Sequence, residues 1–151
     1  MLKLKIPPPV YMVLTAGMMW LLNTSFPVYP LISTPWNQVG YLFMLMGLSF
    51  DATSIIQFFR AKTTVNPIEP TQTNTLVTSG IYQFTRNPMY VGLLLLLIGF
   101  AILQGSLSAL MLVPLFMLIL TRQQIIPEER ILETKFGQRY LEYKMSVRRW
   151  L

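Results

Sequence analysis

The chain contains no cysteine and no histidine among its 151 residues. Their absence excludes disulfide bonds, thiolate and imidazole metal ligands, and nucleophilic catalysis by a Cys–His pair. No metal site is therefore expected. Acidic residues are also few, with six Asp and Glu against twelve Lys and Arg. Any chemistry must depend on Arg, Lys, Asp, Glu, Tyr, Ser or Asn side chains.

Hydrophobic residues, by contrast, are in excess. They make up 53% of the chain, and the mean hydropathy of +0.49 lies far outside the range usual for soluble domains. Four apolar runs account for this excess, at residues 10–32, 36–59, 89–103 and 107–120. The first two are long enough to cross a hydrocarbon core of about 30 Å as helices. The last two are shorter, and the polar residues 104–106 between them predict a helical hairpin.

The basic residues fall only before the first run, between the second and third runs, and after the fourth. They are Lys3, Lys5, Arg60, Lys62, Arg86, Arg122, Arg130, Lys135, Arg139, Lys144, Arg148 and Arg149. Basic residues gather on the cytoplasmic side of membrane proteins. We therefore predict an all-α polytopic protein of the inner (plasma) membrane, with about four transmembrane helices and both termini in the cytoplasm. The charged tail, residues 121–151, would be a cytoplasmic helical segment.

The one-sided charge also bears on partners. This distribution of charge argues against a nucleic-acid partner and predicts that part of the tail contacts anionic membrane lipids.

Lys3 and Lys5 before an apolar run are typical of a signal peptide, but the prolines at 7–9 and the lack of a small-residue cleavage site favour a permanent first helix. At this length we expect one domain, residues 1–151.

Asp51 is the only acidic residue inside an apolar run. An ionisable group at such depth in a membrane is a functional candidate. Helical spacing places it on one stripe with Gly40 and Gly47, a face that lets a second helix approach closely, and Gly92 and Gly99 are expected to serve packing as well. Asp51 therefore either contacts a neighbouring helix or acts directly, for example as the coupling acid of a small four-span transporter.

Two polar segments adjoin the apolar runs on the charged side. The first is Arg86-Asn87-Pro88-Met89-Tyr90, at the start of the third run. The second follows the fourth run and contains Arg122 and the pair Glu128 and Glu129. Pro127, just before this pair, suits the first turn of a helix, where the helix dipole favours acids. Capping explains one acid, whereas two adjacent acids can equally bind hydroxyls and positive groups of a ligand.

The helix that begins near Pro127 is expected to end at Gly137. Beyond it, Tyr140, Tyr143 and Trp150 alternate with basic residues. This pattern is typical of a segment that lies on a membrane surface, here folded over a site.

Together these segments resemble the isoprenylcysteine carboxyl methyltransferase and phospholipid methyltransferase superfamily. The resemblance covers roughly residues 63–150 and rests on the run at 86–90, the Glu128-Glu129 pair, Phe136-Gly137 and the run at 140–144. In that family an Arg-His-Pro-x-Tyr run opens one helix, a Glu-Glu pair follows the next, and both hold S-adenosylmethionine at the cytoplasmic membrane face. This chain has Asn87 in place of the histidine, which excludes a histidine base.

The resemblance implies which residues bind S-adenosylmethionine. Asn87, Tyr90, Glu128 and Glu129 would contact the cofactor, and Pro88 would shape the start of the helix. The sequence has no glycine-rich loop of the Rossmann type, so the pocket must be built from helix ends and the tail.

Methyl transfer from a sulfonium is a direct displacement, in which the protein mainly aligns the reactants. A carboxylate acceptor needs only a cation to position it, and Arg86 is the first candidate and Arg122 the second. An amine acceptor must lose a proton, for which Glu128, Glu129 or Tyr90 would be the base. The predicted function is methyl transfer to a lipophilic acceptor entering from the bilayer, with isoprenylcysteine-type carboxyl O-methylation first. Phospholipid-type N-methylation, a transporter and a non-catalytic adaptor stay open.

Overall fold

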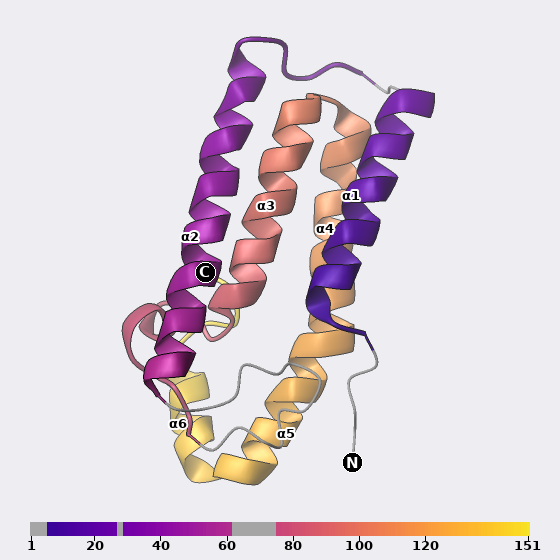
Figure 1. The fold of residues 1–151 in the computed structure, drawn as a ribbon. Coiled ribbons are helices and arrows are strands. Elements are labelled where there is room, and N and C mark those ends of the chain that lie inside the picture. Colours follow the sequence, from indigo (N-terminus) through magenta and orange to yellow (C-terminus); the bar gives the residue numbers. More distant parts are fainter. Residues whose placement is uncertain (1–5, 27–28, 62–74) are drawn as a thin grey trace.

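A computed structural model describes residues 6–26, 29–61 and 75–151. These residues form helices and one isolated β-bridge, with no strand among them. Four long helices make a bundle: α1 (Pro8–Ser25), α2 (Val39–Arg60), α3 (Pro88–Gln104) and α4 (Leu107–Leu120). Successive helices run in alternating directions, and α3 packs against α2 on one side and against α1 and α4 on the other (Figure 1). The all-α prediction is confirmed.

Short helices continue from α4 at one end of the bundle (Figure 1). Helix α4 passes through a π-helical turn, η4 (Thr121–Ile125), into α5 (Ile126–Phe136), and α6 (Gln138–Ser146) follows. The wider π turn lies just before Pro127, whose ring would clash with the preceding turn of an uninterrupted α-helix. Between α5 and α6, Gly137 has φ +53°, a conformation that favours glycine. The predicted helix end at Gly137 is therefore confirmed.

Two helices in the described parts of the chain are long and apolar enough to cross a membrane. One is Trp36–Arg60, which joins the short helix η1 (Trp36–Gln38) to α2, and the other is Leu107–Phe136. Helix α3 is apolar but shorter. Large apolar side chains such as Leu14, Leu45 and Met111 are exposed on the bundle. Such a surface is unfavourable in water and suits hydrocarbon, which supports the membrane character of the chain.

Three of the four predicted runs match the helices to within one residue at each end, but the first does not. Helix α1 ends at Ser25, well short of residue 32. Residues 29–32 instead contact the hairpin between α3 and α4. The N–H of Leu31 donates to the carbonyl of Gly105 (2.7 Å), and the N–H of Leu107 donates to the carbonyl of Tyr29 (3.2 Å). Prolines in this run disfavour a longer helix, and the extended backbone bonds the hairpin tip instead.

Helices α2 and α3 touch through glycines. A Cβ added at Gly40 would lie 2.4 Å from the carbonyl oxygen of Gly99, and one at Gly99 would lie 2.5 Å from that of Gly40. Farther along, a Cβ at Gly47 would lie 2.7 Å from the carbonyl oxygen of Gly92. A Cβ at Gly92 would collide with Asp51 Oδ1 at 2.0 Å. The predicted packing stripe is confirmed, and Asp51 lies against α3 where the stripe continues.

We expect Gly99→Leu to destabilise the protein by about 1–3 kcal/mol, because the new side chain meets the α2 backbone and forces the two helices apart. The measurement is the thermal unfolding midpoint in detergent. Gly17→Leu is the matched control, since a Cβ at this glycine of α1 has nothing within 4 Å. Equal unfolding midpoints for the two variants would contradict the close approach of α2 and α3.

Candidate functional site

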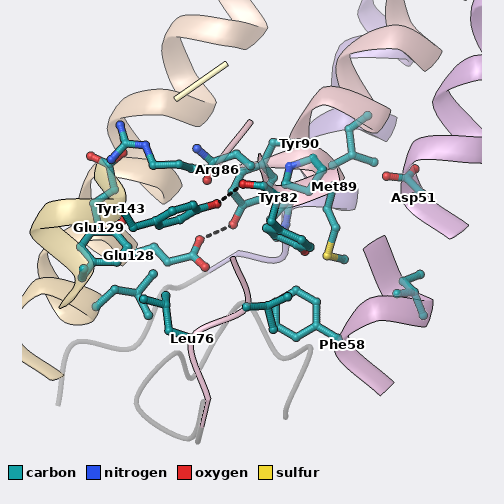
Figure 2. Close-up of a pocket in the computed structure, with 18 of the residues that line it drawn as sticks. Asp51, Phe58, Leu76, Tyr82, Arg86, Met89, Tyr90, Glu128, Glu129 and Tyr143 are labelled. Carbon is teal, nitrogen blue, oxygen red and sulfur yellow. Dashed lines mark hydrogen bonds and ion pairs between the residues drawn. The ribbon is translucent and has the colours of Figure 1, made fainter. Parts of the chain in front are cut away.

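A cavity of about 450 Å³ lies at the charged end of the bundle, between α2, α3, α5 and α6. Apolar side chains such as Ile55, Phe58 and Leu93 form much of its wall. Figure 2 shows Arg86 and Glu129 on one side of it, well separated from Asp51. The lining residues are Pro7, Pro8, Pro9, Asp51, Ile55, Phe58, Thr75, Leu76, Val77, Tyr82, Arg86, Asn87, Pro88, Met89, Tyr90, Leu93, Glu128, Glu129, Leu132, Tyr140 and Tyr143.

One carboxylate in this wall holds two guanidinium groups. Glu129 Oε1 lies 3.1 Å from Arg86 Nη2 and accepts a hydrogen bond from Arg149 Nε at 3.0 Å. Glu129 Oε2 accepts from Arg149 Nη2 at 2.7 Å, which completes a two-bond pair. The side chains of Glu129 and Arg86 are only 6% and 7% exposed, so water screens their charges weakly. Hydrogen bonding to Glu129 raises the pKa of Arg149 above its ordinary value, so Arg149 stays charged.

The same arrangement leaves donors of Arg86 unpaired. Its Nε and Nη1 atoms are buried and have no hydrogen-bond partner among the described residues. A buried donor without an acceptor is costly, and the cost is greater for a charged group. Arg86 lines the cavity, so an anionic ligand there can supply the missing acceptors once the side chains that cover these two nitrogens shift.

Glu128 has a different environment from its neighbour. The hydroxyl of Tyr90 donates to Glu128 Oε2 at 2.7 Å, and both residues line the cavity. Glu128 forms no ion pair within the part of the chain that the structure describes. The two adjacent acids therefore have separate surroundings, because Glu129 is paired with two cations whereas Glu128 keeps acceptor capacity for a ligand.

The segment before α3 is fastened to the C-terminal tail. Asn87 Nδ2 donates to the carbonyl of Arg149 at 2.8 Å, and Thr85 Oγ1 donates to the same carbonyl at 3.2 Å. The backbone N–H of Arg86 donates to the carbonyl of Arg148 at 2.9 Å. Sequence reasoning missed Thr85 and Arg149. Nothing in the pattern of basic residues shows which tail arginine turns inward.

Three tyrosines form the wall on the side of the tail. The hydroxyl of Tyr143 donates to the carbonyl of Tyr82 at 2.6 Å, and the rings of Tyr140 and Tyr143 meet edge to face at 6.2 Å. Burial raises the pKa of all three phenols, so each stays protonated at neutral pH. Because Tyr140 and Tyr143 line the cavity, helix α6 folds over it as the aromatic pattern predicts.

The structure brings together six of the seven residues singled out from the sequence. Those lining the cavity are Arg86, Asn87, Pro88, Tyr90, Glu128 and Glu129. Pro88 opens helix α3, as predicted. Arg122 is the exception: it is exposed on the π turn η4 and lies outside the cavity wall.

Known proteins resemble this chain over most of its length. A family model described as phospholipid methyltransferase matches residues 36–139. Protein-S-isoprenylcysteine O-methyltransferase B of Arabidopsis thaliana is 30% identical over 125 residues, which are 79% of this chain and 61% of that protein. Protein-S-isoprenylcysteine O-methyltransferase of Schizosaccharomyces pombe is 27% identical over 128 residues, 85% of this chain and 51% of that protein.

A shorter, uncharacterized protein of Haemophilus influenzae is 44% identical over 63 residues, 42% of this chain and its own full length. The chain spans between about half and two thirds of the length of the isoprenylcysteine methyltransferases that it matches. No solved structure matches it. Because the family match covers more than half of its residues, the chain belongs to the phospholipid methyltransferase family.

Proposed function

We propose that the protein transfers a methyl group from S-adenosylmethionine to a carboxylate of a lipophilic, isoprenylcysteine-type acceptor. The observation that carries this proposal is the buried guanidinium of Arg86, whose Nε and Nη1 donors lack partners beside the cavity. A carboxylate is the acceptor that such a cation positions, and it needs no base. The relatives named isoprenylcysteine O-methyltransferases support the same choice.

The residues present also fit the cofactor. The cavity, at about 450 Å³, is within the usual range for small-molecule sites. Glu128 can accept hydrogen bonds from hydroxyl or amino groups of S-adenosylmethionine, with Tyr90 orienting its carboxylate. Asn87 and Pro88 lie in the same wall. We assign the cofactor to this part of the cavity, and Glu129 contributes by holding Arg86 beside it.

S-adenosylmethionine, when bound, supplies an electrophilic methyl group. The chain then has to align the acceptor and exclude water. Arg86 holds the acceptor carboxylate through its free N–H groups, and apolar residues such as Ile55 and Leu93 receive the lipid chain. A carboxylate oxygen would form a bond to the methyl carbon as the carbon–sulfur bond breaks and a neutral thioether leaves. The oxygen has no proton to lose, so no side chain has to act as a base.

An amine acceptor is the second candidate, because Asp51 also lines the cavity. Asp51 makes no hydrogen bond or ion pair with the residues that the structure describes. Its carboxylate can pair with a cationic amine on the side of the cavity away from Arg86 (Figure 2). Membership of a methyltransferase family favours either reaction over transport with Asp51 as coupling acid.

We further propose that α1 to α4 all cross the inner (plasma) membrane, with the cavity end in the cytoplasm. Arg60, Arg86 and the basic residues of α5 and α6 lie at that end, in agreement with the positive-inside rule. Exposed tail residues such as Arg122 and Arg148 are then placed to contact anionic lipids. The acceptor would enter sideways from the bilayer, and the cofactor would enter from the cytosol.

The topology can be checked with reporter fusions. A reporter placed after Trp150 should be cytoplasmic, and one inserted at residues 104–106, the tip between α3 and α4, should be periplasmic. The tip between α3 and α4 lies at the end of the bundle away from α5 and α6 (Figure 1). The same compartment for both reporters would refute the four-span arrangement.

Burial raises the pKa of Glu128 to about 7, so the carboxyl is ionised at pH 8. At that pH, replacing Glu128 by Gln should weaken S-adenosylmethionine binding about tenfold, because a neutral amide is a poorer acceptor than a carboxylate. Calorimetry on the detergent-purified protein measures this affinity. Glu133→Gln is the matched control, since Glu133 is on the same helix but pairs with Lys144 outside the cavity wall. An unchanged affinity in Glu128→Gln would remove Glu128 from the cofactor site.

Replacing Arg86 by Lys should lower methyl transfer to an N-acetylated S-isoprenylcysteine on the order of 10- to 100-fold, because an ammonium lacks the fixed donor geometry of a guanidinium. Affinity for S-adenosylmethionine should stay near that of the wild type. Arg122→Lys is the control and should be fully active, since Arg122 is exposed. A fully active Arg86→Lys together with an inactive Arg122→Lys would reverse the two assignments.

A further inference from the structure

We infer that Arg149 is a positioning residue of the acceptor site, which makes the C-terminal tail part of that site. The inference rests on the proposed function, in which Arg86 holds the acceptor carboxylate. Arg148 and Arg149 are adjacent and chemically identical, but Arg148 is exposed whereas Arg149 reaches Glu129 with two hydrogen bonds. This difference gives Arg149 a role that its neighbour does not have.

The position of Arg149 is fixed through both its backbone and its side chain. Its carbonyl accepts hydrogen bonds from Asn87 and Thr85, and its guanidinium pairs with Glu129. The next residue, Trp150, packs against the apolar core of the bundle. These attachments join the end of the chain to the start of α3 and to α5, so the arginine is not a freely moving surface group.

The effect of Arg149 on Arg86 follows from how Glu129 is shared. Arg149 takes both carboxylate oxygens, and Arg86 contacts only Oε1 through Nη2. Without Arg149, both oxygens would be open to Arg86, and a two-bond pair of guanidinium and carboxylate would be the favoured geometry. Such a pair would add either Nε or Nη1 to the Nη2 contact and so use one of the two donors that have no partner among the described residues. Arg149 therefore keeps the Nε and Nη1 groups of Arg86 available.

The charge of the cluster leads to the same conclusion. Arg86, Arg149 and Glu129 together carry one positive charge, which an acceptor carboxylate bound to Arg86 would neutralise. Glu128 lies in the same wall but bonds Tyr90 and pairs with neither arginine. Removal of the charge of Arg149 would leave Arg86 and Glu129 as a neutral pair with no excess attraction for an anion. The arginine thus favours an ionised acceptor over its uncharged methyl ester, which is also the reaction product.

The test compares binding of an N-acetylated S-isoprenylcysteine and of its methyl ester to the full-length protein in detergent, with S-adenosylmethionine affinity measured in parallel. The wild type should prefer the free carboxylate. Arg149→Gln should lose about tenfold in affinity for the carboxylate and little for the ester or the cofactor. Arg149→Lys, which keeps the charge, should recover part of the preference, and Arg148→Gln should behave as wild type.

A double variant separates charge from structure. In Glu129→Gln/Arg149→Gln the positive charge of Arg86 is again uncompensated, so part of the carboxylate preference should return.

If the wild type shows no preference, the proposed carboxylate acceptor fails and the role of Arg149 fails with it. If the wild type prefers the carboxylate and Arg149→Gln does so equally, only the role of Arg149 is overturned. Equal loss of affinity for carboxylate, ester and cofactor in Arg149→Gln would likewise overturn it, because the tail would then be merely structural.

Discussion

The sharing of the Glu129 carboxylate between Arg86 and Arg149 is the interaction on which the site depends. It joins three parts of the chain that are distant in sequence: the start of α5, the segment before α3 and the end of the tail. A carboxylate that is 6% exposed is costly to bury unless it is paired. The two cations offset that cost, and in return the carboxylate fixes where both guanidinium groups lie. Loss of either cation would therefore change the charge of the cavity wall as well as its shape.

Much of the fold could be predicted because the helices are marked by local features. Apolar runs bounded by polar residues, together with Gly105, Pro127 and Gly137, locate the ends of α3, α4 and α5 closely. The end of α1 could not be predicted in this way. Residues 29–32 are apolar enough to continue a helix, but they bond the backbone of Gly105 and Leu107 instead. This contact depends on tertiary structure, and the only local signal for it in the sequence is the prolines at 27 and 30, which disfavour a helix.

The site was only partly predictable, for a related reason. Arg86 and Glu129 are recognisable by their places beside helix starts, and the structure puts them in one cavity wall. The sequence could not show that Glu129 is mainly an ion-pair partner whereas Glu128 bonds Tyr90, because adjacent residues on a helix point in different directions. Nor could it distinguish Arg149 from its neighbour. Such differences arise from packing between distant segments.

Asn87 stands where the resemblance leads one to expect a histidine, and its side chain is bonded to the tail. Asn87 Nδ2 donates to the carbonyl of Arg149, and the backbone N–H of Asn87 donates to Thr85 Oγ1 at 3.2 Å. Both are hydrogen bonds of a neutral amide, and neither requires a group that titrates. A carboxylate acceptor removes the need for a base, so the side chain at this position can hold the tail, and through Arg149 the ion pairs of Glu129, over the cavity. An asparagine at position 87 and a carboxylate acceptor are therefore consistent with each other, whereas an amine acceptor would have to find its base elsewhere in the wall.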